Sequence, residues 1–148
     1  MSVPASKREE SKFQVVDTAT KIYNHILDIC LRMPNRYTYL ILQPILNLAG
    51  DVADNAKRGN SIIPDPTHPN KIDVNLRRAY FQKARASLQA LITRMNFFVD
   101  RPQVLRYKIG DREIGVTEKE LNQLAEDMRT EAALLKGVVD RDQKRYSI

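Results

Sequence analysis

Apolar residues recur every three or four positions along four long segments of the chain, and proline, glycine and polar residues separate these segments. This spacing puts the apolar side chains on one side of a helix and predicts amphipathic α-helices. Four such helices with mostly short connections predict one all-α domain over residues 1–148, folded as an antiparallel, up-down four-helix bundle. The expected helices cover residues 10–32, 36–58, 73–100 and 118–139.

Local signals mark where these helices begin, bend and end. Pro44 lies inside the second segment, where its ring removes a hydrogen bond and should bend the helix near Leu40. Asp73 is expected to cap the third helix, and Thr117 with Glu120 forms a capping-box pattern at the start of the fourth. We expect the tail after residue 139 to be mobile.

Two connections differ in composition from the helices. The stretch "RGNSIIPDPTHPNK", residues 58–71, contains three prolines and predicts a long loop. The stretch "VLRYKIGDREIGV", residues 104–116, alternates apolar and polar residues up to Gly110 and Asp111. That alternation predicts a short β-hairpin-like or extended arm between the third and fourth helices.

The first helix is apolar over more than half of its circumference. A line that includes Phe13, Val16 and Tyr23 is expected to face the core, and an adjoining sector is apolar as well. Either the helix lies deep and contacts two others, or the second sector is an interface between subunits. The interface interpretation assigns that role to Val15, Ile22, Ile26 and Ile29.

The third helix is unusual on the side opposite its expected core stripe, which runs from Tyr80 to Phe98. That opposite side carries mostly small residues instead of charges. Small side chains allow another element to approach closely, although alanine is also simply a good helix former. The residues on this side are Ala79, Ala86, Ala90, Thr93 and Phe97.

Positive charge is concentrated in one part of the chain. The net charge is +6, and residues 71–112 hold ten basic and three acidic residues. Several Lys and Arg side chains on one continuous surface can neutralise phosphates, which predicts binding of a polyanion such as RNA or DNA. Tyr80 and Tyr107 could stack on bases. The candidate nucleic-acid contacts are Arg77, Arg78, Lys83, Arg85, Arg94, Arg101, Arg106, Lys108 and Arg112.

No residue pattern predicts catalysis, a metal site or a cofactor. His25 and His68 have no ligand-type residue at metal-binding spacing, and the glycines form no phosphate-binding loop. Cys30, the single cysteine, lies on the apolar side of its helix, which favours a small core residue and fits a cytoplasmic location. No apolar run is long enough to predict a membrane span. We therefore expect a protein that is not an enzyme.

Four stretches of the chain resemble one bacterial family of small four-helix bundles. They are "MSVPASKREESKFQVVDTA", "RMPNRYTYLILQPILNLAGDVADNAKRGN", "LRRAYFQKARASLQALITRM" and "DRDQKRY". The family comprises the ribosomal-RNA intervening-sequence proteins and the accessory variability determinants of diversity-generating retroelements. The resemblance covers most of the chain, which departs from the family in its proline-rich loop and its arm.

The resemblance implies a protein that is not an enzyme and assembles as a homopentameric barrel with a basic surface. In the retroelement branch, such a protein binds the reverse transcriptase and nucleic acid and supports mutagenic copying of a template RNA into cDNA. The family offers no fixed binding motif, so it is the argument from charge that adds the terminal residues Lys7, Arg8, Lys144 and Arg145 to the candidate contacts. A structural or regulatory adaptor, whose partner is a protein and not a nucleic acid, remains the alternative.

Overall fold

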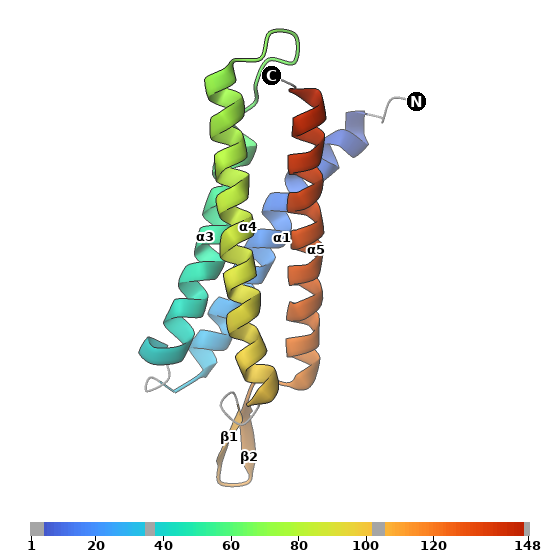
Figure 1. Ribbon diagram of the computed structural model, residues 1–148. Coiled ribbons are helices and arrows are strands. Elements are labelled where there is room, and N and C mark those ends of the chain that lie inside the picture. Colours follow the sequence, from blue (N-terminus) through green and yellow to red (C-terminus); the bar gives the residue numbers. More distant parts are fainter. Residues whose placement is uncertain (1–4, 35–37, 102–105, 147–148) are drawn as a thin grey trace.

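The computed structural model of the protein describes residues 5–34, 38–101 and 106–146. Four α-helices lie lengthwise against one another, and Figure 1 shows that successive helices run in opposite directions. The predicted helical bundle is confirmed. Its helices are α1 (Ala5–Arg32), α3 (Gln43–Ser61), α4 (Lys71–Asp100) and α5 (Glu118–Arg145).

The apolar core runs along the length of the bundle and takes side chains from all four helices. From α1 it takes Val15, Ile22, Ile26 and Ile29, which are between 0% and 5% exposed. The prediction that these four residues form a subunit interface is therefore wrong. The other apolar line of α1 faces outward in part, with Phe13 57% exposed. Both sectors are apolar, so α1 could turn either one inward, and the branched side chains occupy the core.

The second helix begins later than predicted. A π-helical turn, η1 (Thr38–Leu42), precedes α3, and Pro44 lies in the first turn of α3 instead of inside a longer helix. The first turn tolerates proline because the N–H groups there have no helical acceptor. The expected bend near Leu40 is replaced by this change of helix type.

The ends of α4 and α5 differ from the sequence prediction in two places. Asn70 caps α4, because its side-chain Oδ1 accepts from the Ile72 N–H at 2.8 Å, and Asp73 lies within the first turn. The capping box of Thr117 and Glu120 is confirmed at the start of α5. α5 continues to Arg145 and Tyr146 is buried, so the expectation of a mobile tail is wrong for residues 140–146.

A two-stranded antiparallel hairpin connects α4 to α5 and extends beyond the end of the bundle (Figure 1). Its strands are β1 (Arg106–Ile109) and β2 (Arg112–Gly115), with Ile109 paired to Arg112. Gly110 begins the two-residue turn with a φ of 62°, a conformation that glycine adopts without steric cost. Within the described ranges, no helix is long and apolar enough to cross a membrane.

Candidate nucleic-acid interface

The surface of α4 that faces away from the other helices carries most of the candidate basic residues. In Figure 1 this helix lies at the front of the bundle, with α1 behind it. Between Asp73 and Asp100 the sequence of α4 contains no acidic residue. The exposed side of α4 is therefore a continuous surface without negative side chains, which favours contact with a polyanion.

Arg77 does not belong to this surface. Its side chain is only 12% exposed, and its Nε donates to Oδ2 of Asp142 in α5 at 2.6 Å. Its Nη1 donates to the carbonyl oxygens of Gly59 and Ile62 at 3.1 and 2.8 Å. The guanidinium also lies over the Phe81 ring, 4.9 Å from its centroid. Arg77 thus connects three segments of the bundle, and we remove it from the candidate contacts.

Close packing around this arginine depends on a glycine. A Cβ placed on Gly59 would lie 3.0 Å from two atoms of the buried Phe81 ring. That separation is shorter than ordinary van der Waals contact, so α3 can approach α4 this closely only without a side chain at position 59. The three elements that Arg77 connects therefore meet at Gly59, where α3 has no side chain.

The remaining basic residues of α4 form two rows on either side of the small residues. Arg85 lines the groove beside α5 and donates to Oε1 of Gln82 at 3.3 Å. Arg78 lies seven positions earlier, which is two helical turns along the same side of α4. On the side of α3, Lys83 lies over the Tyr80 ring at 5.5 Å and Arg58 of α3 lies over the same ring at 5.9 Å. Further along that row are Arg94, which is exposed, and Arg101, whose guanidinium lies 4.4 Å from the Phe97 ring centroid.

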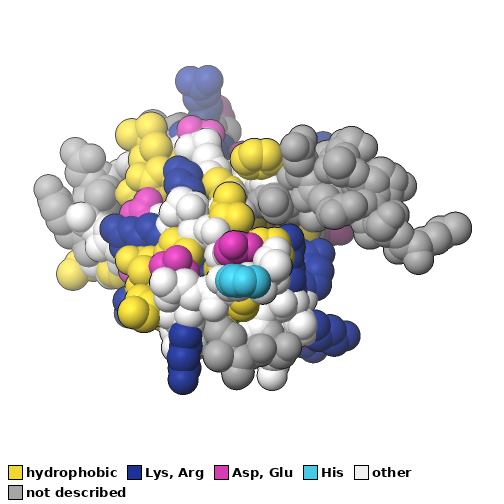
Figure 2. All heavy atoms as spheres, turned by 90° about the horizontal axis from the view of Figure 1, so that it is seen from above, with side chains coloured by type: hydrophobic (Ala, Val, Ile, Leu, Met, Phe, Trp, Pro, Cys, Tyr) yellow, Lys and Arg dark blue, Asp and Glu magenta, His cyan; other side chains and the backbone are white. Residues whose placement is uncertain are grey.

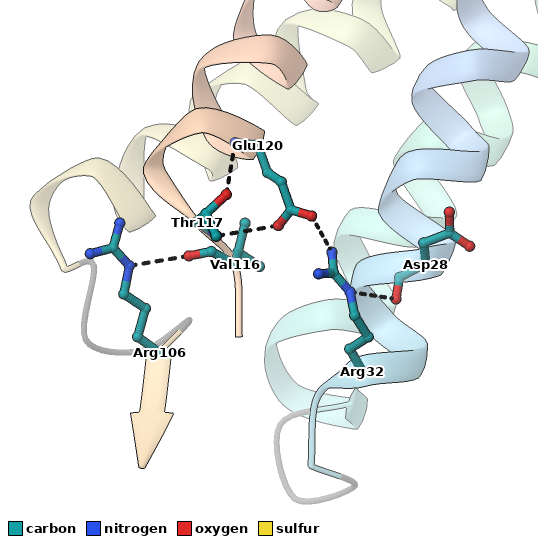
Figure 3. A network of polar contacts seen from close by, with 6 residues as sticks. All are labelled: Asp28, Arg32, Arg106, Val116, Thr117 and Glu120. Atoms are coloured by element: carbon teal, nitrogen blue, oxygen red, sulfur yellow. Dashed lines mark hydrogen bonds and ion pairs between the residues drawn. The ribbon is translucent and has the colours of Figure 1, made fainter. Parts of the chain in front are cut away.

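The hairpin residues are only partly available. Arg106 is half-buried, and its Nε donates to the carbonyl oxygen of Val116 at 3.1 Å, at the base of the hairpin (Figure 3). Arg112 is exposed in β2. The side chains of Lys108 and Tyr107 lie outside the described part of the structure. Of the candidate contacts in the hairpin, only Arg112 is both described and exposed.

The start of α5 is held in place beside this hairpin. Figure 3 shows Glu120 closing the capping box with Thr117 and also pairing with Arg32 of α1, at 3.0 Å between Nη2 and Oε1. Arg32 in turn donates from Nε to the carbonyl oxygen of Asp28 at 3.4 Å. These contacts fix the end of α1 against the start of α5, and so they fix the position of the hairpin base.

An open groove of about 630 Å³ separates α4 from α5 on the outer surface. Ala86, Ala132 and Ala133 contribute small side chains to it, while Arg85 and Lys136 contribute positive charge. Sequence reasoning missed Lys136, because it lies 51 positions from Arg85 and only the fold brings the two helices together. Lys136 extends the basic surface from α4 onto α5.

The terminal candidates are divided between described and undescribed side chains. Lys144 and Arg145 are exposed at the end of α5, and Arg145 lies 5.6 Å from the ring centroid of Tyr146. The side chains of Lys7 and Arg8 lie outside the described residues. Figure 2 looks onto the end of the bundle that carries the α3–α4 loop, and it shows Lys and Arg side chains projecting on several sides. Exposed apolar residues also lie at this end, where Ile63 and Ile72 are 68% and 75% exposed.

Sequence reasoning also missed two buried carboxylates of α5. Asp127 is 6% exposed, and its Oδ1 accepts from Gln123 at 3.1 Å and from Lys21 of α1 at 3.4 Å. Glu131 is fully buried, and neither of its carboxylate oxygens has a hydrogen-bond partner among the described residues. Burial disfavours the charged form and raises the pKa of Glu131 to about 8.

The remaining titratable candidates, Cys30, His25 and His68, lie in three different surroundings. Cys30 is half-buried, and burial raises the pKa of its thiol. The reactive thiolate form is therefore less populated. His25 lies in a polar groove between α1 and α5 together with Asp28 and Asp127, and His68 is exposed in the α3–α4 loop. In the described part of the chain, no three His, Cys, Asp or Glu side chains are grouped so that they could hold a metal ion.

Comparison of the chain with family models, with curated proteins and with solved structures gave no match. The class of protein is therefore defined by the fold and the surface alone: a helical bundle whose exposed α4 side is basic.

Proposed function

We propose that the protein binds nucleic acid through the basic surface formed by α4 and the adjacent part of α5. The observation that supports this most is the run of α4 between Asp73 and Asp100, which exposes several basic side chains and contains no acidic one. Arg85 and Lys136 carry this surface into the groove between the two helices. Arginine suits the role because its planar guanidinium can donate two hydrogen bonds to one phosphate.

The proposal extends to a biological role through the resemblance to the retroelement accessory proteins. We propose that the protein is a cytoplasmic, non-enzymatic accessory factor that binds a reverse transcriptase and its template RNA. In this role it would assemble as a homo-oligomer, and the resemblance implies a pentamer. A reverse-transcriptase gene beside this gene, together with template and variable repeats, would support the role directly.

Charge reversal at Arg78 and Arg85 tests the binding surface. The Arg78→Glu, Arg85→Glu double variant should bind single-stranded RNA more weakly, because two phosphate contacts are lost. We expect the slope of log K against log salt to fall by about 1.4, since each phosphate contact on a single strand contributes about 0.7. Fluorescence anisotropy of a labelled RNA oligonucleotide at several salt concentrations measures this slope.

A matched control carries the same change in charge on other exposed helix surfaces. Lys57→Glu in α3 combined with Lys119→Glu in α5 reverses two exposed cations away from the outer side of α4. An equal loss of binding in both double variants would contradict a localised surface and would indicate only attraction by net charge. Circular dichroism should show unchanged helix content in both.

A protein–protein adaptor is the second candidate function. Exposed apolar residues on the outer side of α4 favour it, since Leu76 and Phe97 are 44% and 42% exposed and nucleic acid has no need of them there. Absence of RNA and DNA binding by the unmodified protein at low ionic strength would reject the nucleic-acid proposal in favour of the adaptor.

A further inference from the structure

The helix α4 carries two sets of residues with coiled-coil spacing, one on each side. The inner seam runs from Val74 to Phe98 in alternating steps of three and four residues, and every position on it is buried or half-buried. The outer seam runs from Ile72 to Phe97 in alternating steps of four and three residues, and every position on it is exposed. A seam with this period is the surface that another helix contacts in a coiled coil. Over 25 steps of about 1.5 Å, the outer seam would be about 38 Å long.

The sizes of the side chains on the outer seam match those of a second copy that runs in the opposite direction. In that arrangement, Ile72 lies opposite Phe97 of the second copy, and Ala79 lies opposite Ala90. Large residues thus meet at both ends and small residues meet near the middle. Two helices that cross at about 20° are closest at the centre and diverge toward their ends, so small central and large terminal side chains fit that geometry.

The polar residues beside the outer seam also match in this arrangement. On the side of α3, Asp73 comes beside Arg94 of the second copy, and the two-fold axis repeats this ion pair. On the side of α5, Gln82 comes beside Gln89 of the second copy, where two amides can donate to each other. Neither Asp73 nor Arg94 has an ion-pair partner among the described residues of its own chain. A parallel arrangement would bring neither pair together.

Lys83, the one charged residue of the outer seam, does not block this contact. Its ammonium lies over the Tyr80 ring, 5.5 Å from the centroid, which holds it to the side of α3. It lies opposite Ala86 of the second copy, where the small side chain leaves room for the aliphatic part of the lysine. A lysine near the two-fold axis still faces its own symmetry equivalent, so it weakens the contact without preventing it.

We propose that the protein associates with a second copy of itself through the outer seams of two antiparallel α4 helices. This inference goes beyond the proposed function. A two-fold contact of this kind closes a dimer, so it is a different contact from the one that would build the five-fold ring implied by the resemblance. Neither Arg78 nor Arg85 is a position of the outer seam, and Arg85 lines the α4–α5 groove. The paired form therefore leaves Arg78 and Arg85 outside the contact, whereas Lys83 and Arg94 of the basic surface take part in it.

A charge swap tests the predicted ion pair. Asp73→Arg places two cations together at each of the two symmetry-related sites, and Arg94→Asp places two anions together. Each single variant should raise the dissociation constant at least about tenfold at low salt, because two attractive pairs become repulsive. The Asp73→Arg, Arg94→Asp double variant should return the dissociation constant to near that of the unmodified protein. Sedimentation equilibrium measures all four proteins, and Asp54→Arg on the exposed side of α3 serves as the control.

Cysteine cross-linking tests direction and register separately. In a Cys30→Ala background, Ala79→Cys combined with Ala90→Cys should form disulfide-linked dimers under mild oxidation, because position 79 faces position 90 of the second copy. Neither single cysteine variant should cross-link, since each position lies far along the helix from its own symmetry equivalent. Cross-linking of the single variants would instead indicate parallel pairing and would overturn the proposal.

Three results contradict the inference. They are a purely monomeric protein at all attainable concentrations, a charge-swapped double variant no better than the single variants, and no cross-link in the paired-cysteine protein. The RNA titration with Arg78→Glu and Arg85→Glu is a separate readout. Loss of RNA binding with intact pairing, or intact RNA binding with loss of pairing, therefore identifies which of the two proposals fails.

Discussion

The inner and outer sides of α4 share the same three-and-four spacing but differ in the residues at the spaced positions. The inner side places Phe81, Leu88 and Leu91 in the core, where each is at most 1% exposed. The outer side places alanines at the corresponding heights, and all of them are exposed. Spacing therefore identifies a surface for helix packing, while side-chain size and polar partners decide which surface is filled within one chain. Adjacent residues therefore serve different purposes, as Arg77 and Arg78 illustrate.

Replacement of Arg77 and of Arg78 should give the largest difference between the two sides of α4 in the free energy of unfolding. Arg77→Ala leaves Asp142 nearly buried and unpaired, since its side chain is 13% exposed. We expect a loss of about 3–5 kcal/mol in the free energy of unfolding. Arg78→Ala should change that free energy by no more than about 0.5 kcal/mol, because its side chain is exposed. Urea titrations followed by circular dichroism measure both, and equal losses would contradict the assigned geometry.

Changes in apolar size should have opposite consequences on the two sides. Leu88→Ala leaves a cavity in the core and should cost about 2–5 kcal/mol of unfolding free energy. Ala86→Leu adds bulk on the exposed side and should alter that free energy by less than about 0.5 kcal/mol. The same Ala86→Leu change should weaken self-association, because the larger side chain separates the centres of the two outer seams. Stability and sedimentation measurements on each variant separate the two effects.

The buried carboxyl of Glu131 extends the comparison from size to charge. Its pKa is about 8 in the folded protein, against an ordinary value of 4.5. Between these values the folded protein keeps a proton that the unfolded chain releases, so its stability falls as pH rises. The fall is about 1.4 kcal/mol per pH unit between the two pKa values, and it ends once the pH exceeds the folded-state pKa.

Glu131→Gln removes this dependence because the amide does not titrate. We expect the variant to gain stability relative to the unmodified protein as pH rises from about 5.5 to 7.5. Glu126→Gln, at an exposed position of the same helix, is the matched control and should leave the pH dependence unchanged. The free energy of unfolding at four pH values in this interval decides the matter. Parallel curves for the unmodified protein and Glu131→Gln would refute the burial argument.

Much of the fold follows from local signals in the sequence. The helical period predicted the four helices, and the pattern at Thr117 and Glu120 fixed the start of α5 because capping depends on neighbouring residues only. The N-cap of α4 was placed three positions too late, at Asp73 instead of Asn70, since both are good N-cap residues. The end of α5 was missed because its charged sequence hides the contact of Asp142 with Arg77, which depends on residues far apart in the chain.

The candidate site was predictable as a region but not residue by residue. The basic segment and the small-residue side of the third helix were both visible in the sequence, and α4 exposes them together. The orientation of α1 could not be predicted from the sequence, because two adjacent apolar sectors satisfy the helical period equally well. Asp127 and Glu131 lie on the buried side of α5, where they interrupt the apolar pattern without changing the period, so no local signal distinguished them.

The double spacing of α4 also constrains handedness. A straight helix has 3.6 residues per turn, so a seam with a strict seven-residue repeat drifts by about 20° per heptad around the helix. The inner and outer seams of α4 drift in the same sense. Helices that follow the inner seam must wind to the left around α4, and any helix that follows the outer seam along its whole length must wind to the left as well. α4 would then be one helix shared by two superhelices, both of them left-handed.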